Sequence, residues 1–197
     1  MEETYDHLVK VLMIGESGVG KTCLIQRFFN SEFHLQHLST IAIDFKLKTL
    51  NVGDSRVKMQ IWDTAGQERF KGMTTSFFRG SDGIVLCYSI DDIASFEKVT
   101  EWMNDIKIHA PTDVSVILVG NKCDIEDNRK VSFEQGEEIA KSYGINFYES
   151  SAKSGKNVKN IFENIATKIV GKVNNNLNSK SGELLDNKSK NKLANCC

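Results

Sequence analysis

Apolar segments of strand length alternate with segments of helical periodicity along the first 170 residues of the chain. Five of these segments are apolar nearly throughout, which is typical of strands covered on both faces, as in a parallel sheet flanked by helices. They cover residues 8–14, 57–62, 83–90, 114–119 and 145–148. Residues 43–52 alternate apolar and polar side chains instead, which predicts a strand nearer the edge of the sheet.

Helical patterns fill the segments between these strands. Apolar residues spaced three and four apart predict helices over residues 96–106 and 158–169. Ser132 and Gln135 form a capping-box pattern, which predicts that a helix begins directly after Ser132. Strands that alternate with helices indicate the α/β class, here a three-layer sandwich with helices on both faces of the sheet.

Composition narrows the class of protein. The 197 residues are 40% hydrophobic, which suits one buried core, and 25 Lys and Arg against 26 Asp and Glu argue against a nucleic-acid-coating protein. No apolar run is long enough for a membrane helix, and the acidic N-terminus lacks a secretory signal. The five cysteines, an odd number, do not suggest a disulfide framework. We therefore expect an intracellular soluble domain.

The last segment of the chain differs from the rest. Residues 172–197 lack aromatic side chains and are rich in Asn, Ser and Lys, with five lysines against two acidic residues. Such a segment cannot bury enough apolar surface to offset its ordering entropy. We expect one domain over residues 1–171 and a disordered, mildly basic tail over residues 172–197 that ends in two adjacent cysteines.

A glycine-rich loop follows the first predicted strand. Residues 15–22 read GESGVGKT, the phosphate-loop pattern, and they lie between a strand and a helical pattern. The backbone N–H groups of such a loop surround phosphate groups, its lysine reaches the terminal phosphates and its hydroxyl can bind Mg²⁺. A chance glycine-rich turn is the alternative, which the strand and helix disfavour. The predicted phosphate-binding residues are Ser17, Gly18, Val19, Gly20, Lys21, Thr22 and Cys23.

A second motif stands at the end of the strand over residues 57–62. Asp63 can hold Mg²⁺ from the side opposite Thr22, and Gly66 offers a backbone N–H to a γ-phosphate. Gln67 is then a candidate for orienting an attacking water molecule. An ordinary turn after a strand is the alternative for this segment taken alone. With the phosphate loop, the pair of motifs indicates a sensor of the terminal phosphate.

Two further polar segments predict which base is bound. Asn121, Lys122 and Asp124 follow one strand, and Ser150 to Lys153 follow another. A fixed carboxylate accepts two hydrogen bonds from guanine, whereas adenine presents an unprotonated ring nitrogen there. Asn121 is expected to tie its loop to neighbouring backbone. The predicted guanine-binding residues are Asn121, Lys122, Asp124, Ser151, Ala152 and Lys153.

Together these motifs resemble those of a Ras-superfamily small GTPase. The segments GESGVGKT, STIAIDFK, WDTAGQERF, NKCD and SSAK are similar to the Rab family in particular, nearest its secretory-pathway group, over residues 5–170 and the last two. The resemblance implies a Ras-like P-loop NTPase sandwich with six strands, one of them an antiparallel edge strand. It implies GTP and GDP as the bound nucleotides and a molecular switch that hydrolyses GTP and regulates vesicle trafficking.

The resemblance also implies roles for single residues. Thr40 would bind Mg²⁺ and sense the γ-phosphate, and Phe33 would lie near the guanine. Phe45, Trp62 and Phe77 match a hydrophobic triad through which Rab proteins meet effectors, so at least part of it is expected to be exposed, with core aromatics as the alternative. Some positions depart from the family pattern in ways that bear on the choice of effector. These are Ala42 in place of Gly, Phe77 and Phe78 in place of two Tyr, and Ser89 in place of Asp.

The two terminal cysteines, Cys196 and Cys197, are Rab-like and predict two prenyl groups, which together suffice for stable membrane anchoring. Free thiols or a disulfide between neighbours are the alternatives. The resemblance implies a monomer with a lipid-anchored pool on the cytoplasmic face of an intracellular or plasma membrane, and a cytosolic pool. It implies an exchange factor, a GTPase-activating protein, a GDP-dissociation inhibitor, a prenylation escort and effectors as partners, and no nucleic acid.

Three functions compete at this point. The first is a prenylated GTPase switch with slow intrinsic turnover, since no arginine is evidently placed in the site. The second is a GTP-binding scaffold that barely hydrolyses, which the intact Gln67 argues against. The third is a phosphoryl-transfer enzyme that acts on a small metabolite.

Overall fold

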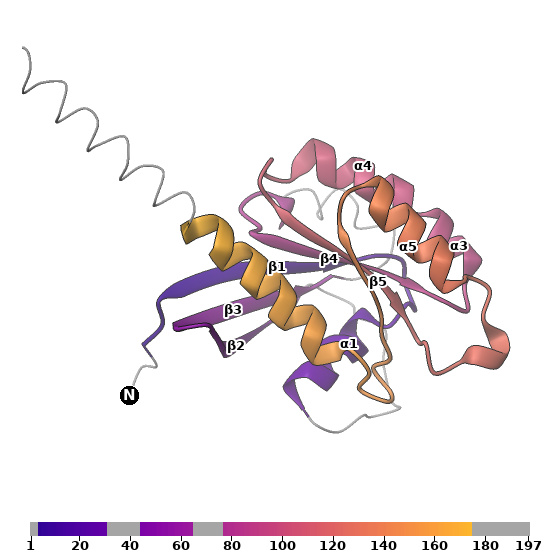
Figure 1. The fold of residues 1–197 in the computed structure, drawn as a ribbon, viewed down its shortest axis with the longest axis horizontal. Coiled ribbons are helices and arrows are strands. Elements are labelled where there is room, and N and C mark those ends of the chain that lie inside the picture. Colours follow the sequence, from indigo (N-terminus) through magenta and orange to yellow (C-terminus); the bar gives the residue numbers. More distant parts are fainter. Residues whose placement is uncertain (1–3, 31–43, 65–76, 175–197) are drawn as a thin grey trace, which may run out of the picture.

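A computed structural model describes residues 4–30, 44–64 and 77–174 of the chain. Within them the chain forms a six-stranded sheet in the order β2-β3-β1-β4-β5-β6 (Figure 1). The strands are β1 (His7–Ile14), β2 (Asp44–Val52), β3 (Ser55–Asp63), β4 (Gly83–Ser89), β5 (Ser115–Asn121) and β6 (Asn146–Glu149). The helices are α1 (Lys21–Phe29), α3 (Ile93–Glu97), α4 (Val99–His109), α5 (Phe133–Ser142), the short 3₁₀ helix η2 (Glu126–Asn128) and a C-terminal helix over residues 158–174.

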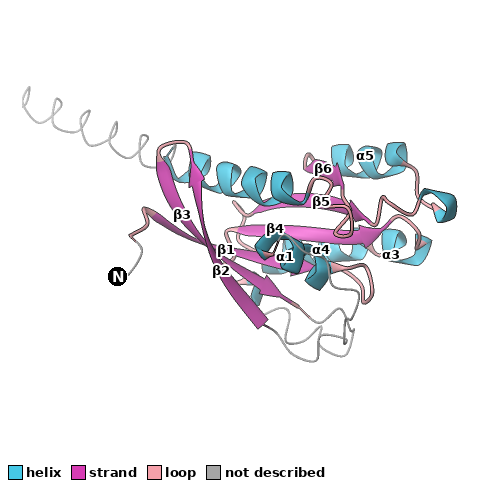
Figure 2. Cartoon of the chain, turned by 90° about the horizontal axis from the view of Figure 1, so that it is seen from below, coloured by secondary structure: helices cyan, strands magenta, loops and turns pink. Residues whose placement is uncertain are grey.

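Strand β1 lies in the middle of the sheet and explains the continuous apolar patterns. It pairs in parallel with β3 and with β4, so both of its edges are occupied. Val11 and Met13 pack with α1 and the C-terminal helix, whereas Leu12 and Ile14 pack with α4 on the other face. The last four residues of β1, Val11 to Ile14, are all buried, and an apolar residue is favoured at each of them. Figure 2 shows the resulting layers, with helices on both faces of the sheet.

The α/β class, the three layers and the six strands predicted from the sequence are confirmed. The segment predicted near the sheet edge is the edge strand β2, and it is antiparallel to β3. The apolar side of its alternating pattern is largely exposed, since Phe45 and Leu47 are each 46% exposed. This alternation therefore marks an open face of the sheet and not a buried one.

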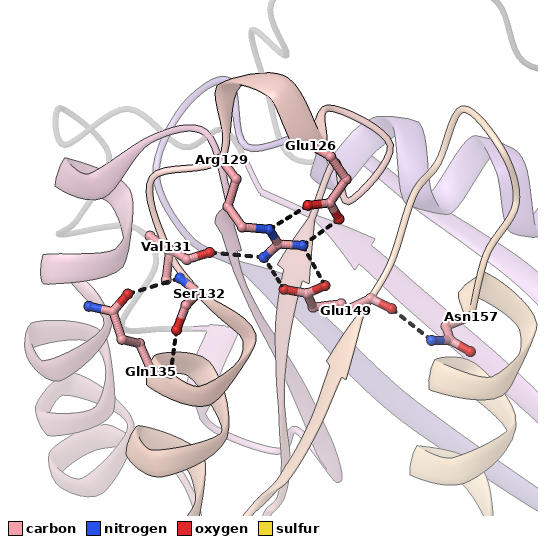
Figure 3. A network of polar contacts seen from close by, with 7 residues as sticks. All are labelled: Glu126, Arg129, Val131, Ser132, Gln135, Glu149 and Asn157. Atoms are coloured by element: carbon pink, nitrogen blue, oxygen red, sulfur yellow. Dashed lines mark hydrogen bonds and ion pairs between the residues drawn. The ribbon is translucent and has the colours of Figure 1, made fainter.

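The helix predicted after Ser132 is also present. In α5 the Ser132 hydroxyl accepts a hydrogen bond from the Gln135 backbone N–H at 3.2 Å, and Gln135 Oε1 accepts one from the Ser132 N–H at 2.9 Å. This reciprocal pair is the capping box, and it satisfies two N–H groups that the first helical turn leaves without partners (Figure 3).

The C-terminal helix continues to residue 174, so residues 172–174, the first three of the predicted tail, belong to a helix. Lys172 Nζ donates a hydrogen bond of 2.7 Å to the Asp113 carbonyl oxygen, which fastens this end of the helix to the loop before β5. The division between domain and tail stays a prediction, because most of the predicted tail lies outside the described residues. Among the described helices, none has the length and apolar composition that a bilayer span requires.

Candidate nucleotide-binding site

The carboxyl ends of the parallel strands meet at one edge of the sheet, and the predicted motifs begin there. The chain turns to opposite sides after β1 and after β4, which are neighbours in the sheet. Open α/β sheets bind ligands in the crevice outside the carboxyl ends of two such strands. The five strands that run parallel end at Ile14, Asp63, Ser89, Asn121 and Glu149, and the predicted motifs follow all of them except β4.

The phosphate loop connects β1 to α1 through backbone conformations that favour glycine. Gly15, Gly18 and Gly20 have φ angles of 133°, 78° and 96°, all in the region that L side chains avoid. A Cβ atom on Gly15 would lie 2.1 Å from the carbonyl oxygen of Cys87 in β4. The first glycine is therefore required by close approach to the neighbouring strand as well as by its φ angle.

Lys21 is the first residue of α1 and is buried, with 5% of its surface exposed. Its Nζ donates hydrogen bonds of 2.8 Å to the carbonyl oxygens of Gly15 and Glu16, so the ammonium group spans the phosphate loop. Burial lowers the pKa of Lys21 from its ordinary value, and nearby acidic groups, Asp63 among them, oppose this shift. A cation held inside the loop raises the affinity of the loop for an anion.

Thr22 and Asp63 come together as the two motifs predicted. The Thr22 hydroxyl donates a hydrogen bond of 2.6 Å to Asp63 Oδ2. Asp63 Oδ1 is buried and has no hydrogen-bond partner among the described residues. Burial raises the pKa of the Asp63 carboxyl, and the Thr22 hydrogen bond opposes that rise. A cavity of about 80 Å³, lined in part by both residues, adjoins the pair.

This donor set fits Mg²⁺. A buried carboxylate oxygen without a partner costs free energy unless a donor or a cation satisfies it. Carboxylate and hydroxyl oxygens are also the ligands that Mg²⁺ prefers, usually with waters and phosphates completing its shell. The arrangement of Thr22 and Asp63 is therefore suited to the edge of a magnesium site.

The Asn121 side chain ties the NKCD loop to the phosphate loop. Its Nδ2 donates a hydrogen bond of 2.8 Å to the carbonyl oxygen of Val19, and its Oδ1 accepts one of 3.3 Å from the Ser150 hydroxyl. The prediction that Asn121 holds neighbouring backbone is confirmed by the first contact. Three loops at the sheet edge are thereby joined through one buried amide.

The predicted guanine residues of the NKCD loop and of the SSAK segment lie together. The Ser151 hydroxyl donates a hydrogen bond of 2.6 Å to Asp124 Oδ1, and Lys153 Nζ lies 3.8 Å from Asp124 Oδ2. The Cys123 N–H donates to the Ser150 carbonyl oxygen at 3.0 Å. Ala152 is buried as part of the core cluster that includes α1 and the C-terminal helix. One oxygen of Asp124 is thus fixed by a neutral donor, while its side chain stays 18% exposed.

Lys122 belongs to the same loop and has a positive φ of 67°, rare for a residue with a side chain. Its Nζ lies 3.5 Å from Asp91 Oδ1, which also accepts a hydrogen bond from the Ser89 hydroxyl. The Ser89 departure from the Rab pattern was expected to bear on the choice of effector, but its side chain is buried and bonds the acidic partner of Lys122. The sequence analysis missed Asp91, and no local motif marks it.

A contact between the phosphate loop and α4 was also missed. The Trp102 indole N–H donates a hydrogen bond of 3.0 Å to the Glu16 carboxylate, although Trp102 was predicted only as part of a helix face. The two residues lie 86 positions apart, so spacing in the sequence could not have paired them.

The comparisons with known proteins agree with this geometry. The family model described as Ras family matches residues 10–171. The chain belongs to the Ras family. It is 49% identical over 178 residues to the Ras-related protein Rab-8B of Homo sapiens, covering 90% of this chain and 86% of that one. It is 51% identical over 170 residues to the Ras-related protein Rab-13 of Mesocricetus auratus, covering 86% and 84%.

These similarities identify a Rab-family small GTPase, near the secretory Rab group. It is a GTP-binding switch of the Rab type, which binds GTP and GDP, hydrolyses GTP and acts in vesicle trafficking. The phosphoryl-transfer enzyme that competed at the start is thereby excluded. Membership of the Rab family also implies regulators and effectors in general.

The aromatic triad of this Rab protein forms a contiguous cluster, in which Phe45 is exposed while Trp62 and Phe77 are partly buried against the core. The ring centres of Phe45 and Trp62 lie 5.0 Å apart, and those of Trp62 and Phe77 lie 5.3 Å apart. Lys10 Nζ lies 4.9 Å from the centre of the Trp62 ring and 5.6 Å from that of Phe77. The expected exposure of part of the triad is confirmed at Phe45, while Phe78 beside it is buried. Its role toward effectors stays a prediction.

Several predicted site residues of the Rab protein lie outside the described residues. They are Phe33, Thr40 and the Ala42 departure in the first gap, Gly66 and Gln67 in the second, and the terminal Cys196 and Cys197. Their assigned roles stay predictions.

Proposed function

We propose that this Rab-type GTPase holds Mg²⁺ together with GTP at the carboxyl edge of its sheet and uses the site as a timed switch. The observation that carries the proposal is the pair formed by Thr22 and Asp63. A hydroxyl and a buried carboxylate meet at 2.6 Å, and the second carboxylate oxygen has no partner among the described residues. This donor set lies beside a loop that is built for phosphate.

The phosphates bind to the loop over residues 17–23. Its backbone N–H groups and the start of α1 both favour negative charge, and Lys21 adds a buried cation. In the nucleotide-bound protein, Lys21 exchanges its carbonyl partners, at least in part, for phosphate oxygens. These features support a site for the β- and γ-phosphates.

Thr22, Asp63 and the predicted switch residue Thr40 would hold Mg²⁺, directly or through water. When bound, the ion neutralises charge that develops on the phosphates during hydrolysis. Asp63 and Thr22 fix its position from two different elements, β3 and α1. Because Asp63 is the last residue of β3, the sheet itself determines where its carboxylate lies.

Guanine binds between the NKCD and SSAK loops. Asp124 accepts hydrogen bonds from the guanine ring N–H and amino group, and the Ser151 contact orients its carboxylate. The stem of Lys122 covers the base and sugar, and Phe33 is the aromatic residue that the family resemblance assigns to the base. A backbone N–H of the segment from Ser151 to Lys153 meets the guanine carbonyl.

Thr40 and Gly66 contact the γ-phosphate and Gln67 orients the attacking water. Loss of the γ-phosphate releases both loops, which ends the active state. Intrinsic turnover is slow, and an arginine from a GTPase-activating protein accelerates it by roughly 10³–10⁵.

Single-turnover GTP hydrolysis with and without a Rab-activating partner tests the switch. Gln67→Leu should slow hydrolysis and leave GTP binding intact, since Gln67 acts on water and not on the nucleotide. A protein that hydrolyses no GTP even with the partner would be a scaffold, and unchanged hydrolysis in Gln67→Leu would contradict the role of Gln67.

Removal of Mg²⁺ by a chelator tests the metal site. Bound GDP should leave the unmodified protein faster when the chelator is added. In Asp63→Asn the release should already be fast with Mg²⁺ present, and the chelator should change it less. Equal responses of the two proteins would contradict the metal role of Asp63.

The Rab protein is further proposed to act on the cytoplasmic face of a membrane, anchored by prenyl groups on Cys196 and Cys197, as a monomer that binds no nucleic acid. Its partners are then an exchange factor, a GTPase-activating protein, a GDP-dissociation inhibitor, a prenylation escort and effectors. The mildly basic tail suits an anionic leaflet. A tagged protein should lose its membrane location when both cysteines are changed to serine.

A further inference from the structure

One arginine side chain joins the segment that follows the NKCD loop to the strand that precedes the SSAK loop (Figure 3). Arg129 follows η2 and lies five positions after Asp124. Its guanidinium contacts Glu149, the last residue of β6, which directly precedes the Ser150–Lys153 segment. The arginine therefore connects the segment after NKCD with the strand that carries SSAK.

All five N–H donors of Arg129 are used. Nε and Nη2 donate to the two oxygens of Glu126 at 2.8 and 2.7 Å. Nη1 and Nη2 donate to the two oxygens of Glu149 at 2.5 and 2.9 Å, and Nη1 also donates to the Val131 carbonyl oxygen at 2.9 Å. Two bidentate pairs and one backbone contact fix the guanidinium plane completely.

The Glu149 side of this arrangement is buried. Only 8% of the Glu149 side chain is exposed, against 62% for Glu126. Its backbone carbonyl accepts a hydrogen bond of 2.7 Å from Asn157 Nδ2, so both the backbone and the side chain of Glu149 are held. A buried carboxylate without its cation would be costly, so Arg129 and Glu149 depend on each other.

The rest of the segment after Asp124 is attached to the sheet mainly beyond Arg129. The Lys130 and Val131 N–H groups both donate to the Ile90 carbonyl oxygen, at 2.8 and 3.0 Å. Between Asp124 and Lys130 the backbone makes only short-range turns, such as the Arg129 N–H to the Glu126 carbonyl oxygen. The Arg129 side chain is therefore the long-range contact that fixes the distal part of this loop against β6.

We propose that Arg129 is a positioning residue for guanine recognition, which sets the Asp124 carboxylate against the Ser151–Lys153 segment by clamping their loops together through Glu149. The proposal rests on the guanine site proposed above. Arg129 does not touch the nucleotide in this role. It determines how well Asp124 meets both guanine donors at once, and hence how strongly the site prefers guanine to a base that lacks the amino group.

Release of two nucleotides from the full-length protein tests this role. GDP and inosine diphosphate, each labelled on the ribose, differ only in the exocyclic amino group of guanine. This group is present in GDP and donates a hydrogen bond to Asp124 in the proposed site. In Arg129→Lys the charge near Glu149 remains but the planar five-donor geometry is lost. GDP release should become about tenfold faster. Inosine diphosphate release should change less, so the preference for GDP should fall. Glu149→Gln should shift the preference in the same direction.

Lys141→Met is the matched control, because Lys141 forms an exposed ion pair of 2.8 Å with Glu137 within α5. It should leave both release rates unchanged. A general loss of stability in Arg129→Lys would speed the release of both nucleotides by the same factor. Either that outcome or unchanged release rates would overturn the positioning role of Arg129 and leave the guanine site standing. Equal release of both nucleotides by the unmodified protein would overturn the guanine site together with this inference.

Discussion

Asn121 Nδ2 donates a hydrogen bond of 2.8 Å to the carbonyl oxygen of Val19, which precedes it by 102 residues. The contact joins the proposed base-binding side of the site to the phosphate loop. Because Asn121 is buried and ends β5, its amide cannot be replaced by water without cost. The two sides of the proposed nucleotide site are therefore held together by this hydrogen bond, and a substitution on either side should affect the other.

Asn121→Ala should lower the free energy of unfolding by about 1–3 kcal/mol, because it leaves the Val19 carbonyl oxygen and the Ser150 hydroxyl without this partner. GDP release should also become faster. Denaturant unfolding and release of labelled GDP check both effects. Asn146→Ala is the control, since the half-buried Asn146 bonds Asn164 away from the site. A similar rise in GDP release for both variants would contradict the linkage.

Gly15→Ala should prevent the phosphate loop from closing on β4. The new Cβ would lie 2.1 Å from the Cys87 carbonyl oxygen at a φ of 133°. We therefore expect the free energy of unfolding to fall by about 3 kcal/mol or more. Gly53→Ala is the control, because Gly53 has a φ of 58° and no atom within 4 Å of the new Cβ. It should cost about 1 kcal/mol. Thermal unfolding of the two variants measures both losses. A similar loss of stability in Gly15→Ala and Gly53→Ala would contradict the close approach of Gly15 to Cys87.

Trp102→Phe should destabilise the protein more than Trp62→Phe does. The Trp102 indole N–H bonds the Glu16 carboxylate at 3.0 Å, and a hydrogen bond to a charged group is worth about 1.5–3 kcal/mol. The Trp62 indole N–H is buried without a hydrogen-bond partner among the described residues, so its removal leaves nothing unpaired. Free energies of unfolding from denaturant titrations compare the two. The reverse order would show that the Glu16 contact contributes little.

Cys87 should resist alkylation in the native protein. It is 1% exposed, and burial raises the pKa of its thiol to about 12. The thiolate is the reactive form, and at pH 8 it makes up roughly one in ten thousand of such thiols. Raising the pH increases that fraction but not the access. Peptide mass spectrometry after iodoacetamide treatment should find Cys87 unlabelled until denaturant is added, whereas Cys23, which is partly exposed, should be labelled sooner. Rapid native labelling of Cys87 would contradict its burial.

The strands and helices could be predicted because their signals are local. Strand β1 is apolar at nearly every position since both faces are covered, and the capping box of α5 lies within four consecutive residues. The phosphate-loop motif is similarly local, because its glycines adopt positive φ angles within eight consecutive residues, although the close approach of Gly15 to Cys87 is a tertiary contact. The exposure of part of the aromatic triad was less direct, since the open face of β2 at Phe45 depends on which elements cover the sheet.

The site beyond its motifs could not be predicted in the same way. Glu16 pairs with Trp102, Lys122 with Asp91 and Arg129 with Glu149, and in each pair the partners stand on different elements. Their sequence separations are set by the lengths of the intervening elements, so no spacing rule identifies them. The helix that continues beyond the predicted boundary at residue 171 is a similar case, because Lys172 is held by a carbonyl oxygen 59 residues away.

By itself, the sequence determined the α/β class, the order of the elements and the residue types available for phosphate, metal and guanine, since these depend on periodicity and on motifs of a few residues. Only the tertiary structure decided which side chains hold those motifs in place. It placed the buried Asn121 amide between three loops and Arg129 between two carboxylates. Such contacts depend on strand register and on the burial of particular side chains, which arise only when distant segments pack together.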